Sequence, residues 1–258
     1  MKYPILLPNI FNYPFTYESD LDLKIGEYVS VPFGKNKLTG VVWDKLEDNE
    51  QKKFKLKKVF KKLQVNPLKK TTINFLNWFS EYNIIPKGMA LKLMLLSNNA
   101  IEDNIKNNFQ VFESNIKNNS IKLSEDQKKS LKEMVVLKNK FKVHVLQGTT
   151  GSGKTFVYFE ALKSIIQKGF QGLILLPEIG LTGQFQQKFV EYFGFNPAVW
   201  HSGISKKKKE IIWNGISNGK IQVIIGARSS LFLPFKKLGI IIVDEEHDQS
   251  FKQDEGIT

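Results

Sequence analysis

The sequence predicts an α/β protein in which a parallel-sheet lobe follows a small β-barrel and a short helical segment. Three observations support this prediction. Short aromatic and branched runs are separated by turn signals over residues 1–63, apolar strands alternate with helices after residue 120, and a glycine-rich phosphate-loop pattern covers 148–155. Apolar strands that alternate with helices indicate a parallel sheet covered on both faces. We place the domain boundaries at 1–64, 65–120 and 121–258.

Composition restricts the class of protein. A chain of 258 residues with 41% hydrophobic content can bury packed cores, and a formal charge of +13 favours a polyanionic partner. No apolar run of 18 residues occurs and prolines interrupt the apolar start, which argues against a membrane span and a signal peptide. Without cysteine, disulfides and thiolate-bound zinc are excluded. We therefore expect a cytoplasmic protein with no membrane partner.

The pattern of the first 63 residues predicts β structure. The runs are rich in aromatic and branched residues and lie at 4–7, 15–17, 27–33, 38–44 and 54–63. Five short strands favour a small barrel or curled sheet. The last run is crowded by lysines at 52, 53, 55, 57, 58, 61 and 62. These lysines form either a solvated edge or a surface that follows phosphates.

Residues 67–96 change to a helical pattern. Ile73, Leu76 and Phe79, with Trp78 and Tyr82, recur near helical spacing, and a second helix is predicted at 89–96. We interpret the aromatic residues as core and not as base-stacking groups. The asparagine-rich stretch 98–120 has no clear periodicity and reads as a linker or a loosely specified small domain.

The sequence GTTGSGKT fits the phosphate-loop pattern G-x-x-x-x-G-K-[ST]. An apolar run at 143–146 is suited to a buried strand before it, and a helix is predicted at 155–168. The residues of the phosphate loop, all predicted to bind the nucleotide, are Gly148, Thr149, Thr150, Gly151, Ser152, Gly153, Lys154 and Thr155. Lys154 would reach the β- and γ-phosphates and the Thr155 hydroxyl would bind Mg²⁺. The alternative is an ordinary Gly/Thr/Ser loop, but strand, loop and helix occur in the order that nucleotide binding requires.

Further strands and helices follow the phosphate loop. Strands are predicted at 172–176, 198–200, 221–225 and 239–243, and helices at 124–139, 181–192 and 205–216. The last strand delivers Asp244 and Glu245 to the carboxyl edge of the sheet, where such folds bind ligands. Asp244 can hold Mg²⁺, and Glu245 can orient and deprotonate the water that attacks the γ-phosphate. A solvated acidic turn is the alternative, and the phosphate loop favours nucleotide hydrolysis.

Arg228 is the only arginine among 38 basic residues. Its planar fork binds phosphate or carboxylate through directed hydrogen bonds, which an ammonium group cannot copy. We therefore expect Arg228 to contact a DNA strand or to anchor the loop that does. The alternative is that one arginine survived by chance.

These motifs resemble those of superfamily 2 DNA helicases, and more narrowly the first, RecA-like motor lobe of the PriA family of primosomal replication-restart helicases. The segments that carry the likeness are GTTGSGKT, LLPEIGLTGQ, HSG, GARS, GIIIVDEEHD and SFKQDE. Residues 1–64 resemble that family's 3′-DNA-end-binding domain, and NPLKKTTINFLNWFSEYNIIPKG resembles the start of its winged-helix domain. The resemblance implies an ATP- and Mg²⁺-dependent, 3′-to-5′ DNA helicase that recognises stalled forks and starts primosome assembly.

The resemblance also assigns roles to individual residues. Gln127 would contact adenine, although Ser124 and Gln127 also form a helix capping box, S-x-x-Q. Thr16 stands where the family usually has aspartate, and Gly183 where it has proline. The residues implied to contact DNA or to relay its presence are Phe15, Tyr17, Gly34, Lys57, Pro177, Glu178, Ile179, Thr182, Gly226, Ala227, Arg228, Ser229, His247, Phe251 and Lys252.

The family's second lobe, its arginine finger and its cysteine-ligated zinc sites have no counterpart in these 258 residues. We therefore expect a truncated or split helicase that binds ATP and hydrolyses it slowly alone. The resemblance implies a monomer whose partners are forked DNA, single-strand-binding protein and other primosome proteins. A non-catalytic fork-binding module is the alternative, whereas a transporter ATPase is disfavoured because no LSGGQ-like signature occurs.

Overall fold

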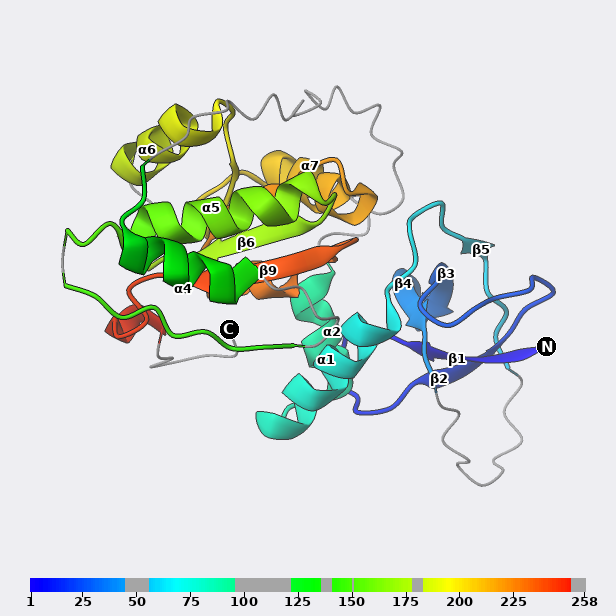
Figure 1. The fold of residues 1–258 in the computed structure, drawn as a ribbon. Coiled ribbons are helices and arrows are strands. Elements are labelled where there is room, and N and C mark those ends of the chain that lie inside the picture. The colour runs from blue at the N-terminus through cyan, green and yellow to red at the C-terminus, as the bar shows by residue number, and fades with distance from the viewer. Residues whose placement is uncertain (45–55, 96–121, 136–140, 150, 178–182, 252–258) are drawn as a thin grey trace. The chain divides into compact units, whose positions relative to one another are not determined.

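The computed structural model describes residues 1–44, 56–95, 122–135, 141–149, 151–177 and 183–251. The chain forms two compact units (Figure 1). The first comprises Met1–Asn108, Ser205–Asn218 and Phe232–Pro234, and the second comprises Phe109–Ile204, Gly219–Leu231 and Phe235–Thr258. The predicted linker at 98–120 lies outside the described residues.

The first unit is built on an antiparallel five-stranded sheet of order β2-β1-β4-β3-β5. Its strands are β1 Lys2–Leu6, β2 Phe15–Glu18, β3 Tyr28–Phe33, β4 Asn36–Val42 and β5 Lys61–Lys62. Alternate residues point inward, so Ile5, Val29 and Val31 form a buried core with Tyr17. This arrangement confirms the β structure predicted from the short branched and aromatic runs.

The predicted fifth strand is much shorter than expected. Within the described part of 54–63, only Lys61–Lys62 is a strand, preceded by an isolated bridge between Lys58 and Glu18. The reason is that this segment changes partner: Val59 N donates to Glu18 O at 2.9 Å, and Phe60 N donates to Ser30 O at 2.9 Å. The segment therefore hydrogen-bonds both outer sides of the sheet, β2 and β3, and closes it toward a barrel.

The helices described in the first unit are α1 Lys70–Tyr82, α2 Lys87–Met94 and α7 Lys206–Asn218. Ile73 and Leu76 of α1 are buried, as predicted. Trp78 and Tyr82 were wrongly expected in the core, since their side chains are 54% and 74% exposed. Trp78 lies five residues after Ile73, about 140° around the helix, which places it on the solvent side.

Helix α7 follows β7 in the sequence but groups with the first unit. Trp213 is fully buried, and its indole N–H donates to Met94 O at 2.9 Å. Its ring meets Tyr28 edge-on, with centroids 6.0 Å apart. A bulky aromatic residue of α7 therefore completes the packing of the amino-terminal sheet and α2.

The second unit is built on a parallel sheet of order β7-β8-β6-β9. Its strands are β6 Gln171–Leu175, β7 Ala198–Trp200, β8 Val223–Gly226 and β9 Leu238–Val243. The helices described in this unit are α4 Glu125–Val135, α5 Lys154–Gln167 and α6 Gly183–Phe193. Two short 3₁₀ helices are also described, η2 Arg228–Phe232 and η3 Gln249–Phe251. The alternation of parallel strands and helices confirms the predicted α/β lobe.

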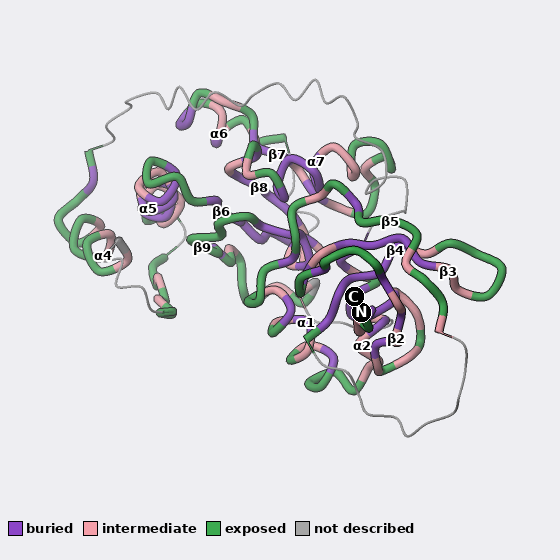
Figure 2. The backbone as a smooth tube through the Cα atoms, turned by 90° about the vertical axis from the view of Figure 1, so that its right-hand side faces the viewer, coloured by how far each residue is buried: buried purple, intermediate pink, exposed green. Residues whose placement is uncertain are grey.

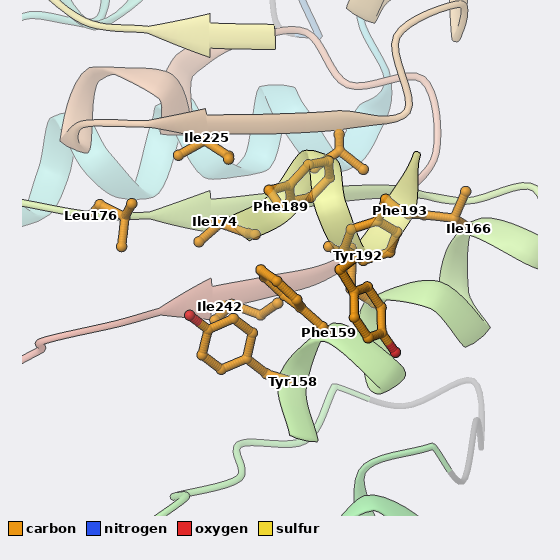
Figure 3. Close-up of a cluster of buried hydrophobic side chains, with 12 residues drawn as sticks. Tyr158, Phe159, Ile166, Ile174, Leu176, Phe189, Tyr192, Phe193, Ile225 and Ile242 are labelled. Carbon is orange, nitrogen blue, oxygen red and sulfur yellow. The ribbon is translucent and has the colours of Figure 1, made fainter. Parts of the chain in front are cut away.

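The core of the second unit lies where α5 and α6 cover the sheet. Phe159 of α5 is fully buried among Tyr158, Phe189, Tyr192 and Phe193 (Figure 3). Along the chain trace, α5 is buried over much of its length while α4 is largely exposed (Figure 2). Helix α5 is thus held firmly, which fixes the phosphate loop at its amino end.

The strand predicted before the phosphate loop is not formed. Residues 141–149 carry no secondary structure, and Phe141, Val143 and Val145 are 94%, 70% and 88% exposed. A strand requires a neighbouring edge, and among the described residues β9 pairs only with β6. Ile241 and Val243 of β9 are correspondingly exposed, by 45% and 48%, so the predicted cover on both faces is incomplete at this strand.

Among the described helices, none has the length and apolar character that crossing a membrane would require.

Candidate functional site

The carboxyl ends of three strands meet at one edge of the parallel sheet. Leu175 of β6 is in register with Gly226 of β8 and with Val243 of β9. The backbone continues this alignment, since Asp244 N donates to Leu175 O at 3.1 Å. The segments that follow the three strands therefore leave the sheet side by side, and they contain many of the predicted site residues.

The phosphate loop leads into α5 with glycines where the backbone turns left-handed. Gly151 and Gly153 have φ of +82° and +79°, a region that side chains rarely adopt. The Lys154 ammonium donates to the carbonyls of Gly148 and Thr149 at 2.7 and 3.2 Å. Ser152 N also donates to Thr149 O at 3.2 Å. The lysine is thus held over the loop in which the sequence predicts the phosphates.

Gln127 joins α4 to this loop. Ser124 N donates to Gln127 Oε1 at 2.9 Å and Gln127 N donates to Ser124 Oγ at 3.3 Å, which confirms the predicted capping box. The Gln127 Nε2 group donates to Ser152 O at 2.9 Å. The same side chain, which the resemblance assigns to adenine contact, therefore caps one helix and contacts the loop.

Asp244 is held by a residue that the sequence did not indicate. The Tyr158 hydroxyl donates to Asp244 Oδ2 at 2.6 Å, and Tyr158 lies one helical turn after Thr155 on α5. Burial, reinforced by the hydrogen bond to Asp244, raises the pKa of Tyr158 well above its ordinary value, so the phenol stays protonated. Tyr158 was missed because an aromatic residue in a helix normally indicates core packing.

Glu245 follows Asp244 in a strained conformation. Its φ of +52° is left-handed, a region that costs a residue with a side chain about 1–3 kcal/mol and is often found at functional sites. Glu245 N donates to Asp244 Oδ1 at 3.1 Å. The Glu245 carboxylate lies 3.5 Å from His247 Nε2, and both side chains are largely exposed. The predicted catalytic carboxylate is therefore open to solvent and next to a predicted DNA-sensing residue.

The lone arginine anchors a neighbouring loop. Arg228 lies in η2 after β8, and its Nη1 donates to Phe251 O at 3.1 Å. Ser229 Oγ accepts from the indole of Trp200 at 3.2 Å. Arg228, Ser229 and Phe251, all predicted DNA-binding residues, are thus brought together at the carboxyl edge.

The remaining second-unit predictions are only partly described. Pro177 is buried and lies two residues after the end of β6, at the same edge. Gly226 ends β8, and Ala227 N donates to Trp200 O at 3.0 Å. Thr150, Glu178, Ile179, Thr182 and Lys252 lie outside the described residues, as do the lysines at 52, 53 and 55.

The residues predicted to hold a DNA 3′ end lie in the first unit. Phe15 packs edge-on against Phe33, with centroids 5.4 Å apart, and Gly34 follows Phe33 in an open turn with φ of +59°. The Lys57 side chain is exposed, and its carbonyl accepts from Glu18 N at 3.0 Å. The structure thus gathers Phe15 and Gly34 at one end of the barrel.

Tyr17 differs from the other predicted 3′-end residues because it is only 4% exposed. Its hydroxyl donates to Pro32 O at 3.0 Å, and burial raises the pKa of Tyr17 to about 12. The side chain is thus part of the barrel core. Its packing supports Phe15, two residues earlier in the same strand.

The oxygen groups of Thr155 and Asp244 suit Mg²⁺. This ion takes hydroxyl, carboxylate and phosphate oxygens and keeps several waters, so two protein ligands suffice when a nucleotide supplies the others. Asp244 accepts from the Tyr158 phenol, and Tyr158 lies on the same side of α5 as Thr155, so α5 brings the two groups toward each other. Among the described residues, no group of three or more His, Asp or Glu side chains is arranged so that it could hold a metal ion.

Comparison with known proteins agrees with this geometry. Residues 4–96 match the 3'DNA-binding domain (3'BD) family of PriA, and residues 124–257 match the DEAD/DEAH box helicase family. Replication restart protein PriA of Rickettsia conorii is 42% identical over 257 residues, 98% of this chain and 38% of the relative. PriA of Bacillus subtilis is 45% identical over 114 residues, 44% of this chain and 14% of the relative.

The chain spans 38% of the length of the Rickettsia conorii relative, and it matches Rickettsia typhi PriA over the same share at 41% identity. The helicase match covers more than half of the chain, and the 3'DNA-binding match covers most of the first unit. The chain therefore belongs to the DEAD/DEAH box helicase family, and over nearly its whole length it is similar to the amino-terminal part of replication restart protein PriA.

Proposed function

We propose that this chain binds ATP with Mg²⁺ and DNA, and that it supplies these sites to a 3′-to-5′ DNA helicase that restarts replication at stalled forks. The observation that carries the proposal is the convergence of the phosphate loop, Asp244 and the Arg228 loop at one edge of the parallel sheet. The relatives' name, replication restart protein PriA, supports the biological setting. Unwinding and primosome assembly, with single-strand-binding protein and other primosome proteins, are proposed for the full-length protein.

In this proposal the loop and the strand ends divide the work on the nucleotide. The backbone N–H groups of the phosphate loop and the amino end of α5 attract the phosphates, and Lys154 exchanges its loop carbonyls for phosphate oxygens. Thr155 and Asp244 hold the metal, which neutralises charge on the β- and γ-phosphates when it is bound. Glu245 accepts the proton of the attacking water.

The DNA contacts are proposed at two separate sites. One site lies at the carboxyl edge of the sheet, where Ser229 and the loop that Arg228 anchors contact the backbone of a DNA strand. His247 contacts the same DNA strand and pairs with Glu245, so it links DNA binding to the nucleotide site. In the first unit, Phe15, Gly34 and Lys57 form the surface for a DNA 3′ end. The match of residues 4–96 to a 3′-DNA-binding family supports the second site.

ATP hydrolysis with and without DNA tests the proposed function. The chain alone is expected to bind ATP and to hydrolyse it slowly, because two-lobed motors hold ATP between lobes and a trans-acting arginine accelerates hydrolysis by about 10³–10⁵ in related phosphate-loop enzymes. Adding the remainder of a full-length relative in trans is expected to raise the DNA-stimulated rate. DNA binding without any nucleotide binding would favour the alternative, a non-catalytic fork-binding module.

Affinity for DNA is expected to fall steeply with salt. The formal charge is +13, and α7 begins with four consecutive lysines, 206–209. Each lysine–phosphate contact releases condensed counterions, so six to ten contacts would cost about 10³–10⁵ in affinity between 50 and 200 mM salt. Fluorescence anisotropy of a labelled forked DNA across this range measures the slope. Affinity that stays flat would contradict binding through phosphates.

Arg228→Lys is expected to weaken single-strand DNA binding or its coupling to ATP, by about threefold to tenfold. Lysine lacks the planar fork that reaches Phe251 O, so the loop after β9 loses its anchor. Titration of labelled single-stranded DNA, with and without ATP, measures the effect. Lys168→Ala, at the exposed far end of α5, is the control and should leave binding unchanged. An Arg228→Lys protein that binds and melts like wild type would contradict a specific role for the arginine.

A further inference from the structure

One phenol holds a carboxylate that the proposed function assigns to Mg²⁺. Tyr158 Oη donates to Asp244 Oδ2 at 2.6 Å. Tyr158 is only 6% exposed, so water does not compete freely for this bond. The contact spans 86 positions in the sequence and ties the start of α5 to the end of β9.

The chemistry of the phenol and the carboxylate defines their hydrogen bond. A phenol has one proton, and here it goes to Asp244 Oδ2. Asp244 Oδ1 accepts from Glu245 N at 3.1 Å, so both carboxylate oxygens are oriented. Carboxylate oxygens carry further lone pairs, which leaves Asp244 able to bind a metal or its water.

We propose that Tyr158 is a positioning residue for the Mg²⁺–nucleotide site, because its phenol, on the helix that follows the phosphate loop, fixes the Asp244 carboxylate. This inference rests on the proposed function and extends it to a residue that does not itself touch the nucleotide. Groups that orient metal ligands typically change metal affinity by about 10- to 100-fold when they are removed. The spacing of three residues places Thr155 and Tyr158 on the same side of α5, so the phenol that holds Asp244 lies on the side of the helix that carries Thr155.

A purely structural role is the competing explanation, and the chain contains a matched control. Tyr192 of α6 is 4% exposed, and its hydroxyl donates to Glu160 Oε1 of α5. Its environment is similar, since burial and the carboxylate raise the pKa of Tyr192 well above its ordinary value. Glu160 is not among the residues assigned to nucleotide, metal or DNA. Tyr192→Phe therefore removes the same chemical contact at a position without a ligand.

The experiment compares nucleotide affinity with and without metal. A fluorescent ATP analogue is titrated into wild type, Tyr158→Phe and Tyr192→Phe, first in 5 mM EDTA and then in 5 mM Mg²⁺. The quantity compared is the ratio of nucleotide affinity in Mg²⁺ to nucleotide affinity in EDTA. We expect Tyr158→Phe to reduce this ratio by about 10-fold and to leave the affinity in EDTA unchanged. Tyr192→Phe should match wild type in both conditions, although both variants lose a comparable amount of thermal stability.

Further measurements separate the outcomes. Tyr158→Phe added to Asp244→Asn should cause no additional loss of Mg²⁺-dependent binding, because the phenol acts through Asp244. A gain with Mg²⁺ in Tyr158→Phe equal to or larger than that of wild type would overturn the inference and leave the proposed function standing. Wild type that binds no nucleotide in Mg²⁺ would overturn the proposed function as well. If Tyr158→Phe does not fold, Tyr158→His keeps a ring donor and should retain part of the gain, and no retained gain would reject the role.

Discussion

Lys154→Ala is expected to abolish measurable ATP binding, with a loss of at least about 100-fold in affinity, while DNA binding is largely retained. The ammonium group lies over the phosphate loop and donates to the carbonyls of Gly148 and Thr149. Charge-assisted hydrogen bonds to phosphate are stronger than these neutral contacts, and their loss leaves the phosphate charge uncompensated. Titration of a fluorescent ATP analogue measures the affinity for nucleotide, and fluorescence anisotropy of labelled forked DNA measures the affinity for DNA.

The matched control for Lys154→Ala lies on the same helix. Lys168 is exposed at the carboxyl end of α5, and Lys168→Ala removes the same charge far along the chain from the loop. It should bind ATP like wild type. A folded Lys154→Ala protein that retains nucleotide affinity would exclude the phosphate loop as the binding site. Loss of DNA binding in the same variant would show that the nucleotide and DNA sites are not independent.

Phe159→Ala is expected to destabilise the second unit by about 3–5 kcal/mol, the usual cost of removing a fully buried aromatic ring. Phe159 has no exposed surface and contacts the rings of Tyr158, Phe189, Tyr192 and Phe193. The surrounding rings belong to two helices that pack on the sheet, so they cannot close the cavity by moving one side chain (Figure 3). Urea denaturation followed by circular dichroism measures the change.

Two further variants calibrate this result. Phe159→Leu retains much of the volume and should cost clearly less than Phe159→Ala. Phe170→Ala removes a ring that is 36% exposed and should cost less again. If Phe159→Ala unfolds at the same urea concentration as wild type, the aromatic cluster does not determine the stability of this unit. Because the chain has two units, the unfolding transition of the second unit must be identified separately. A nucleotide that binds the second unit should shift that unit's transition to higher urea concentration.

Local sequence signals predicted the phosphate loop and the strand ends well. The glycine pattern predicted the loop because Gly151 and Gly153 occupy left-handed backbone that other residues rarely adopt. The apolar run at 239–243 predicted β9, and the capping residues Ser124 and Gln127 predicted the start of α4. In each case the determining interaction lies within a few residues, or the apolar pattern reports burial directly.

Other features depend on partners that are distant in the sequence. The bond between Tyr158 and Asp244 cannot be inferred from either residue, since tyrosine in a buried helix normally indicates packing alone. The run at 143–146 has the composition of a strand, but a strand also requires an edge with which to pair. Trp78 fits a loose helical spacing, and only its angle around α1 relative to Ile73 reveals that it faces solvent.

The first unit is assembled from segments that are far apart in the sequence, and this has a consequence for synthesis on the ribosome. Its sheet and first two helices are complete by residue 95, but α7, which carries the buried Trp213, emerges more than 100 residues later. At about 5–20 residues per second, this delay lasts several seconds. During that time Tyr28 and the carbonyl of Met94 lack the indole that covers them in the finished protein. The nascent chain therefore passes through an interval in which this apolar site is open to chaperones or to aggregation.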